Sequence, residues 1–328
     1  MFHIIDSTLN YITEENTEFT KVNVLQFISL LKKAGINDIL ISKYVYRLLE
    51  GEIPTDVKLY LELESLESPS GFWGISNFFK RHHTGENKVI CSYQLNDVRE
   101  IMQLKTFNLS SGVMLTGLDD FICFDYKTKF RQIRKYVNTD RIIIRPENNL
   151  NCATAIAVEY IMDCGGDVIT SFLGVGNLAA TEQVLLALKV TGQFRMKQNY
   201  TALIEMKELY EELCLGKVGS KSPIVGDSIF DIESGIHVDG VLKKPSNYEC
   251  VSPQILGRTR QIVLGKHSGK ASVEYKRLEL KLPKLTEEQA GYVLAQIKEI
   301  SMRNRRSVSD EEFTELVNRL VGAGAIVS

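Results

Sequence analysis

The sequence predicts an α/β protein whose first two thirds form a (β/α)8 barrel. Short apolar runs alternate there with segments of helical period, giving about seven strand–helix units in about 215 residues. The predicted strands are continuous runs rich in β-branched residues, which is typical of parallel strands buried on both faces. This number of units fits a closed barrel better than an open sheet. No G-x-G-x-x-G follows the first strand, which weakens the dinucleotide-binding alternative.

The first strand is expected at residues 2–6, where Phe-His-Ile-Ile-Asp is apolar up to the acid at its end. Similar apolar runs predict further strands at 38–42, 57–63, 89–93, 112–116, 141–145 and 167–170. Amphipathic spacing predicts helices at 22–34, 118–136, 153–164 and 179–190. The first part of the chain is thus expected to alternate strands and helices throughout.

The pattern changes at residues 216–220, where Gly-Lys-Val-Gly-Ser predicts a hinge. Farther on, Thr286 with Gln289 and Ser309 with Glu312 form two capping-box signals, each at the start of an amphipathic helix. We therefore expect three parts: a barrel domain at 1–216, a loop-rich linker subdomain at 217–282 and a C-terminal helical subdomain at 283–328.

Composition argues against several classes of function. The chain is 44% hydrophobic and 24% charged, and its formal net charge of −2 gives no electrostatic reason to expect nucleic acid or an anionic membrane as a partner. Six cysteines without a C-x-x-C pair are expected to be reduced thiols. The first fifteen residues lack a basic region and a long apolar stretch, and no window has the length of a membrane span. We expect a cytoplasmic protein.

Two clusters of glycine and polar residues concentrate the chemistry of the chain. They are Glu-Ser-Gly-Ile-His-Val-Asp-Gly at 233–240 and Leu-Gly-Lys-His-Ser-Gly-Lys at 264–270. They hold two of the five histidines, His237 and His267. A histidine among glycines and carboxylates is in a setting where its pKa can be tuned for proton transfer near neutral pH.

These clusters, together with Ile-Val-Gly-Asp-Ser-Ile-Phe at 224–230 and Leu-Gly-Arg at 256–258, resemble the homocitrate synthase and isopropylmalate synthase family. This family is the acyl-CoA condensing branch of the metal-dependent TIM barrels. The similarity covers nearly the whole chain, although it is weak in the barrel. Residues 238–243 and Pro245 resemble the homocitrate synthases of nitrogen fixation more than the leucine-pathway enzymes. The resemblance implies acetyl-CoA and a 2-oxo acid as substrates.

The same resemblance implies a degenerate TIM barrel without its metal site. In the family, D-T-T-L-R-D-G-E-Q ends the first strand, its arginine holds the oxo acid, and its second aspartate binds a divalent metal. Asn10 and Tyr11 stand at those positions here, and a neutral amide lacks the charge and the bidentate geometry of a guanidinium. The family's H-x-H-N-D becomes Arg-Pro-Glu-Asn-Asn at 145–149, which places a cation at a ligand position. We therefore expect this barrel to bind no metal.

Other residues do not restore the lost ligands by their spacing. The family's G-x-G-E-R-x-G-N loop is shortened to Leu-Gly-Val-Gly-Asn-Leu at 173–178, without the Glu-Arg pair. The remaining histidines fall before the end of the first strand or in a connecting loop: His3, His82 and His83. An alternative hard-cation site would use three oxygen donors: Asp6, Glu147 and Asn148. The nearby Arg145 opposes it.

In the resembled enzymes the active form is a dimer, in which the C-terminal subdomain of one protomer covers the barrel mouth of the other. The residues implied to act there correspond to Glu233, His237 and Tyr248. We expect His237 to do acid/base work, Glu233 to orient or polarise it, and Tyr248 to donate a hydrogen bond. The chain is thus expected to be the omega-type, non-metal subunit of a two-subunit homocitrate synthase, with a partner subunit whose intact barrel binds the divalent metal.

Each of these assignments has a structural alternative. His237 could stabilise a glycine-rich turn, Glu233 could cap that turn, and Tyr248 could only pack against its loop. His267 is interpreted as shaping the subdomain, and Lys266 as either a CoA-phosphate contact or a solvated cation. A non-catalytic scaffold paralogue stays open as a second reading. A self-sufficient, metal-free barrel is a third, but it needs a Schiff-base lysine at a strand end, where none is predicted.

Overall fold

The structure is a computed structural model. It describes residues 2–16, 18–81, 88–106, 112–137, 139, 141–192, 198–213 and 215–324. The chain divides into two compact units. The barrel unit comprises residues 1–218 with 223–225, and the C-terminal unit comprises 219–222 with 226–328. The predicted further division of the C-terminal part near residue 282 stays a prediction.

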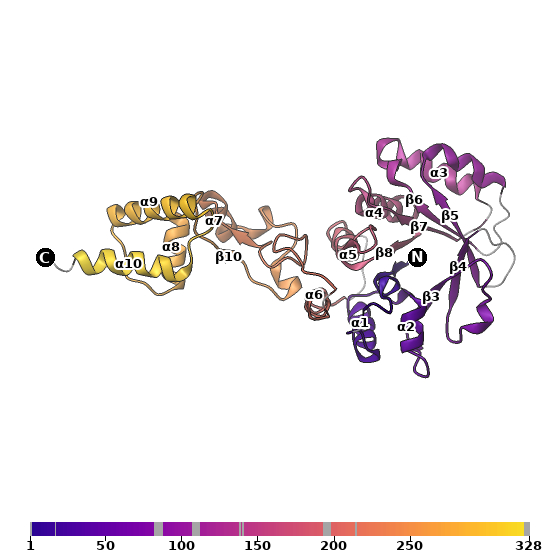
Figure 1. Ribbon diagram of the computed structural model, residues 1–328. Coiled ribbons are helices and arrows are strands. Elements are labelled where there is room, and N and C mark those ends of the chain that lie inside the picture. The colour runs from indigo at the N-terminus through magenta and orange to yellow at the C-terminus, as the bar shows by residue number, and fades with distance from the viewer. Residues whose placement is uncertain are drawn as a thin grey trace. The chain divides into compact units, whose positions relative to one another are not determined.

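The barrel unit is a closed barrel of parallel strands, which confirms the predicted fold class (Figure 1). The strands pair in chain order, and the last pairs with the first to close the sheet. They are β1 (Ile4–Asp6), β2 (Asp38–Ile41), β3 (Lys58–Leu63), β4 (Asn77–Arg81), β5 (Val89–Leu95), β6 (Val113–Gly117), β7 (Ile142–Pro146) and β8 (Asp167–Thr170).

Strand β4 was not predicted from the sequence, because Asn-Phe-Phe-Lys-Arg offers only two apolar residues before its charged end. It places Lys80 next to its last residue, Arg81, and none of the described barrel strands ends in a lysine. Phe79 belongs to the barrel core, and successive side chains on a strand point to opposite faces. Lys80 therefore faces away from the interior, where its Nζ donates to the Glu67 carbonyl at 2.8 Å.

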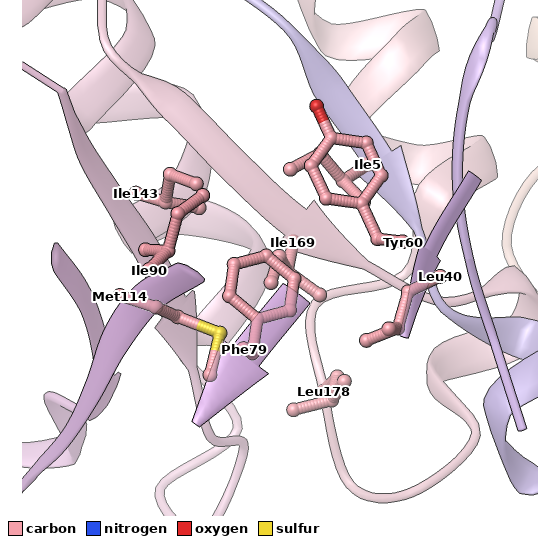
Figure 2. Packing of buried hydrophobic residues seen from close by; sticks show 9 residues of the cluster. All are labelled: Ile5, Leu40, Tyr60, Phe79, Ile90, Met114, Ile143, Ile169 and Leu178. Atoms are coloured by element: carbon pink, nitrogen blue, oxygen red, sulfur yellow. The ribbon is translucent and has the colours of Figure 1, made fainter. Parts of the chain in front are cut away.

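Apolar side chains from every strand fill the barrel interior. The cluster consists of Ile5, Leu40, Tyr60, Phe79, Ile90, Met114, Ile143, Ile169 and Leu178 (Figure 2). Within it, the rings of Tyr60 and Phe79 stack with centroids 5.6 Å apart. Because side chains alternate along a strand, residues two positions after these also face the interior, one step closer to the carboxyl end of the barrel. This periodicity decides which side chains reach the barrel mouth.

The α-helices of the barrel unit are α1 (Lys21–Lys33), α2 (Lys43–Leu48), α3 (Tyr126–Tyr136), α4 (Ala153–Cys164), α5 (Thr181–Val190) and α6 (Ala202–Glu212). Short 3-10 helices lie at Thr8–Tyr11, Pro69–Gly71, Val98–Thr106, Asp119–Cys123 and Phe172–Gly174. The single helix predicted at 118–136 is wrong. Leu118 has a left-handed φ of 62°, and the Asp125 side chain accepts from the Thr128 backbone, so α3 begins only after the separate 3-10 turn.

The C-terminal unit contains a two-stranded parallel sheet and four α-helices (Figure 1). Its elements are β9 (Asp231–Ile232), α7 (Gly235–Lys243), β10 (Gln261–Ile262), α8 (Lys270–Glu279), α9 (Glu287–Asn304) and α10 (Asp310–Gly324), with 3-10 turns at Pro245–Asn247 and Pro253–Leu256. Both predicted capping boxes are present, at Thr286 with Gln289 and at Ser309 with Glu312.

One apolar core joins the helices of this unit to the segment after β10. Its members are Leu264, Val273, Val293, Ile297, Val308, Phe313 and Val317. Leu264 also bridges to Val308 between α9 and α10. The segment that carries the second glycine cluster is therefore anchored on the helical core. Over the part of the chain that the structure describes, none of the helices is both long and apolar enough to cross a membrane.

Candidate functional site

The two glycine clusters lie side by side because they follow the two strands of the same small sheet. β9 pairs with β10 in parallel, so both strands end at the same edge. Glu233 comes directly after β9, and the 264–270 segment begins two residues after β10. A Cβ atom on Gly235 would lie 2.7 Å from the Cα of Gly269, so the two segments approach at distances that only glycine permits.

Glu233 is the side chain that ties the two clusters together. Its carboxylate accepts a hydrogen bond from the backbone N–H of His267 at 2.7 Å. Its backbone carbonyl accepts from the Ser268 hydroxyl at 3.4 Å, and that hydroxyl accepts from the N–H of Gly265 at 2.9 Å. Among the described residues, no hydrogen bond joins Glu233 to His237. In this structure Glu233 therefore holds the 264–270 segment and does not orient the imidazole.

His237 lies in the first turn of α7, so the glycine-rich turn predicted around it is a helix instead. The imidazole is exposed, and its ring meets the ring of Tyr248 edge-on, with centroids 5.8 Å apart at an angle of 66°. Tyr248 in turn lies over Gly240, where a Cβ would come within 2.2 Å of the phenol. A helix position without a side chain thus brings the phenol beside the imidazole.

Exposed apolar side chains accompany this pair along the chain. Ile236 is 81% exposed, Leu242 is 53% exposed and Tyr248 is 48% exposed. All three lie on α7 or in the segment directly after it. Ile236 and Leu242 are six positions apart on the helix, so their side chains point to different sides of it.

Two arginines hold loops of this unit, and one of these loops carries Tyr248. The Arg260 guanidinium forms a two-pronged ion pair with Glu249, the residue after Tyr248, with one N···O distance of 2.7 Å. Arg258 bonds to Asp227 at 3.0 Å and to the Gly226 carbonyl. These supports were not identified as such from the sequence, because the partners lie 11 and 31 residues apart in loops without a regular period.

A cavity of about 420 Å³ lies next to Glu233. Its lining consists of Glu233, Lys266, Ser301, Met302, Arg305, Arg306 and Ser307. Arg306 is engaged with Glu312, whereas Lys266 is exposed and makes no ion pair with a described residue. Lys266 thus faces a cavity, which neither of its two sequence-based interpretations anticipated.

In the barrel unit, the carboxyl end of the strands is where TIM-barrel enzymes place their active sites. Asp6 ends β1 and is fully buried. One of its oxygens accepts from the Thr181 hydroxyl at 2.6 Å, and the other accepts from the N–H of Thr8 at 2.9 Å. Burial raises the pKa of Asp6, although these hydrogen bonds oppose the rise. Both carboxylate oxygens are therefore bonded within the chain.

Tyr11 ends the 3-10 helix that follows β1 and lies against Gly176. A Cβ atom on Gly176, whose φ is +71°, would come within 2.0 Å of the Tyr11 ring. The ring also packs against the barrel core. Burial raises the pKa of the Tyr11 hydroxyl, and the nearby Arg145 partly opposes that rise. A neutral phenol thus stands where the resemblance places a metal-binding carboxylate.

Arg145 on β7 forms an ion pair with Glu62 on β3. Each lies two residues beyond a core side chain, Ile143 and Tyr60 respectively, so both face the barrel interior. The pair lines a cavity of about 500 Å³. Glu62 was not identified from the sequence. The sequence pattern that could have identified it is an acidic residue two positions after an inward-facing one, in a strand that is otherwise mostly apolar.

The donors of the alternative hard-cation site are also engaged. Asn148 Oδ1 accepts from the N–H of Ala153 at 3.1 Å, and Glu147 accepts from Gln94 at 3.3 Å. With a guanidinium and a phenol beside them, these groups do not fit a divalent cation. Across the described ranges, no three His, Cys, Asp or Glu side chains are grouped as metal ligands would be.

The remaining histidines lie elsewhere. His3 is at the amino end of the barrel, where its Nδ1 is 3.1 Å from Asp38 Oδ2. His82 and His83 lie outside the described residues.

Comparisons with known proteins match both the C-terminal unit and the whole chain. A family model described as "Homocitrate synthase post-HMGL domain-like" matches residues 224–305. The homocitrate synthase omega subunit of Clostridium pasteurianum is 27% identical over 343 residues, which cover 96% of this chain and 94% of that protein. The chain is thus similar over nearly its whole length to a homocitrate synthase subunit, and its C-terminal part matches a homocitrate synthase domain model.

Homocitrate synthases and isopropylmalate synthases are also similar to this chain over part of their length. Homocitrate synthase AksA of Methanothermobacter thermautotrophicus is 32% identical over 58% of this chain and 49% of that protein. 2-Isopropylmalate synthase 2 of Caldanaerobacter subterraneus is 34% identical over 56% of this chain and 48% of that protein. The chain thus matches about half the length of these relatives. Among solved structures, hydroxymethylglutaryl-CoA lyase from Pseudomonas aeruginosa has a TM-score of 0.47 at 9% identity, covering 70% of this chain and 97% of that one.

Proposed function

We propose that this chain is a subunit of a heteromeric homocitrate synthase, which condenses acetyl-CoA with 2-oxoglutarate and water to give homocitrate and CoA. In this proposal it donates His237, Tyr248 and the segment held by Glu233 to the barrel of a partner subunit. That partner's barrel binds the divalent metal and the 2-oxo acid. The match of residues 224–305 to a homocitrate synthase domain model and the similarity to a protein named as an omega subunit support this reading.

The observation that carries the proposal is the exposed imidazole–phenol pair. His237 and Tyr248 are held beside each other by α7 and by the Arg260–Glu249 ion pair, yet both rings face solvent. A side-chain pair that is positioned but uncovered fits a site completed by another surface. Meanwhile the chain's own barrel mouth holds Tyr11 and the Arg145–Glu62 pair where substrate and metal would lie.

The proposed chemistry assigns a proton transfer to His237 and a hydrogen bond to Tyr248. The His237 imidazole removes a proton from the acetyl methyl group, whose carbon then forms a bond with the keto carbon of the oxo acid. The Tyr248 hydroxyl donates a hydrogen bond to the oxygen on which negative charge develops. Water then cleaves the thioester and releases CoA. The partner's metal supplies polarisation of the keto group, and Glu233 keeps the 264–270 segment in place beside the pair.

The test is coexpression with a synthase subunit from the same genome that has intact R-D-G-E-Q and H-x-H motifs, followed by an assay of CoA release. We expect the complex to be active and this chain alone to be inactive. His237→Ala should lower kcat by about 100-fold or more without preventing complex formation. Lys243→Gln, at the exposed end of the same helix, is the matched control and should leave kcat unchanged.

The scaffold reading is the second candidate, and the engagement of Glu233 in a purely structural hydrogen bond favours it. It predicts that the complex forms and keeps its activity when both His237→Ala and Tyr248→Phe are introduced. If that double variant keeps its activity, the chain acts as a scaffold and does not donate catalytic residues. Homocitrate formation by this chain alone would overturn both readings.

A further inference from the structure

A second cavity opens at the opposite end of the barrel from the mouth, among the amino ends of the strands. Its volume is about 690 Å³. The lining includes Lys58, Asn77 and Asp167, which begin β3, β4 and β8, together with Arg134 and Arg141. We propose that this cavity binds a small organic anion with two or more negative charges, a phosphate ester or a polycarboxylate. This proposal concerns a different site from the proposed function and does not depend on it.

Arg141 is held rigidly in the cavity wall by residues of three strands. Its guanidinium donates to the Tyr60 hydroxyl at 2.8 Å and to Asn77 Oδ1 at 3.3 Å, and its Nε lies 3.5 Å from Asp167 Oδ2. A guanidinium has five N–H groups, so two have no partner among the described residues. An arginine fixed in this way loses little side-chain entropy when it binds a phosphate or carboxylate.

The acid groups near Arg141 are themselves engaged. The Tyr60 hydroxyl donates to Asp38 Oδ1 at 2.8 Å, and His3 Nδ1 contacts the other oxygen of Asp38. Asp167 accepts from the backbone N–H of His3 at 2.9 Å. Figure 2 shows that the Tyr60 hydroxyl points away from the apolar side chains of Phe79 and Leu178. These contacts form a polar base beneath the cavity.

Two further cations line the cavity and lack partners. The side chains of Lys58, at the start of β3, and of Arg134, on α3, form no ion pair or hydrogen bond with a described residue. With Arg141 they place three cations around the cavity, against one lining carboxylate, that of Asp167. A concave site with an excess of one charge concentrates the opposite charge. The cavity thus favours anions.

Size and chemistry restrict the ligand. Pockets for small molecules are typically about 300–1,000 Å³, so a cavity of about 690 Å³ suits a metabolite rather than a lone inorganic ion. Arginine forks pair with the oxygens of phosphates and carboxylates alike. The aromatic side chains of Tyr60 and Tyr160 and the apolar side chain of Ile142 offer a surface for the carbon skeleton. Phosphate esters and polycarboxylates of this size can both carry negatively charged oxygens at the two ends of a short carbon skeleton.

Calorimetric titration of the full chain tests this proposal, with citrate and glucose 1,6-bisphosphate as separate probes. We expect one of them to bind saturably at one site per chain. Lys58→Gln with Arg134→Gln should weaken that binding by about tenfold or more. The charge-matched control is Arg131→Gln with Lys135→Gln, which removes two exposed cations of α3 that do not line the cavity. It should change Kd by less than about twofold.

The two probes distinguish the sources of the anion. Saturable binding of glucose 1,6-bisphosphate alone assigns the site to phosphate esters, and binding of citrate alone assigns it to polycarboxylates. The proposal is overturned if neither probe binds at concentrations up to about 10 mM, where even a site with a millimolar Kd fills. It is equally overturned if the control variant weakens binding as much as the cavity variant, because the attraction would then be diffuse.

Discussion

The carboxylate of Glu62 is the only described anion in ion-pair contact with the Arg145 guanidinium inside the barrel mouth. The Arg145 side chain is 17% exposed and that of Glu62 is 38% exposed, so the pair is partly shielded from water. The Nε atom of Arg145 is buried and has no hydrogen-bond partner among the described residues. The guanidinium therefore depends strongly on this single carboxylate.

Glu62→Gln should destabilise the barrel unit because it leaves the guanidinium without its anion. We expect a loss of about 1–2 kcal/mol in the free energy of unfolding, at the lower end for broken buried pairs because Glu62 is partly solvated. Glu64→Gln is the control: that carboxylate is 81% exposed and pairs with Lys43, so its loss should cost under about 0.5 kcal/mol. Urea unfolding measures both. Equal effects of the two variants would contradict the role given to Glu62.

Glu182 should make stability depend on pH. It is buried at the start of α5, accepts from the N–H of Leu173 at 2.9 Å, and burial raises its pKa to about 7. In the unfolded chain the glutamate loses its proton near its ordinary pKa of 4.5. Between these values the folded chain holds more protons, so the free energy of unfolding falls as pH rises, by about 3 kcal/mol in total.

Glu182→Gln removes this dependence while keeping an oxygen for the Leu173 N–H. Urea unfolding at pH 5 and pH 8 should show that the variant gains about 2.5 kcal/mol relative to the parent as pH rises. Glu208→Gln, an exposed carboxylate on α6, controls for loss of a negative charge. A parent-to-variant difference that is the same at both pH values would show that Glu182 is ionised in the folded chain throughout.

Much of the barrel could be predicted because its strands are continuous apolar runs. Seven of the eight strands were located in this way, and β4 was missed because its Phe78-Phe79 pair is too short to register as a strand alone. What makes β4 a strand is its pairing with both β3 and β5. That information is carried by the neighbours in space and not by the local sequence.

The residues of the candidate site were selected from motifs and stay predictions, whereas their geometry is seen only in the structure. Glu233, His237 and Tyr248 were selected from their motifs, and the structure brings His237 and Tyr248 into ring contact. It places the Glu233 carboxylate on the backbone of His267 instead. The parallel pairing of β9 with β10 decides this arrangement, and two-residue strands in polar loops give no periodic signal in the sequence.

Variants at Glu233 should separate a positioning role from a catalytic one. Glu233→Gln keeps an oxygen acceptor for the His267 N–H, whereas Glu233→Ala removes it. In the partnered enzyme we expect the Gln variant to keep most of its kcat and the Ala variant to lose about tenfold. Hydrogen exchange of the 264–270 amides should rise only in the Ala variant. If Gln costs as much activity as Ala with exchange unchanged, the carboxylate acts chemically.

Gly240→Ala should displace Tyr248 from His237 without unfolding the C-terminal unit. The new Cβ would come within 2.2 Å of the exposed phenol, which can swing away, and alanine favours a helix over glycine by about 0.5–1 kcal/mol. Gly291→Ala on α9 is a matched control, because a Cβ there meets nothing within 4 Å. Thermal unfolding should show both variants at least as stable as the parent. Only Gly240→Ala should lower kcat of the partnered enzyme, since only it separates the two rings, and full activity in that variant would exclude the ring pair from catalysis.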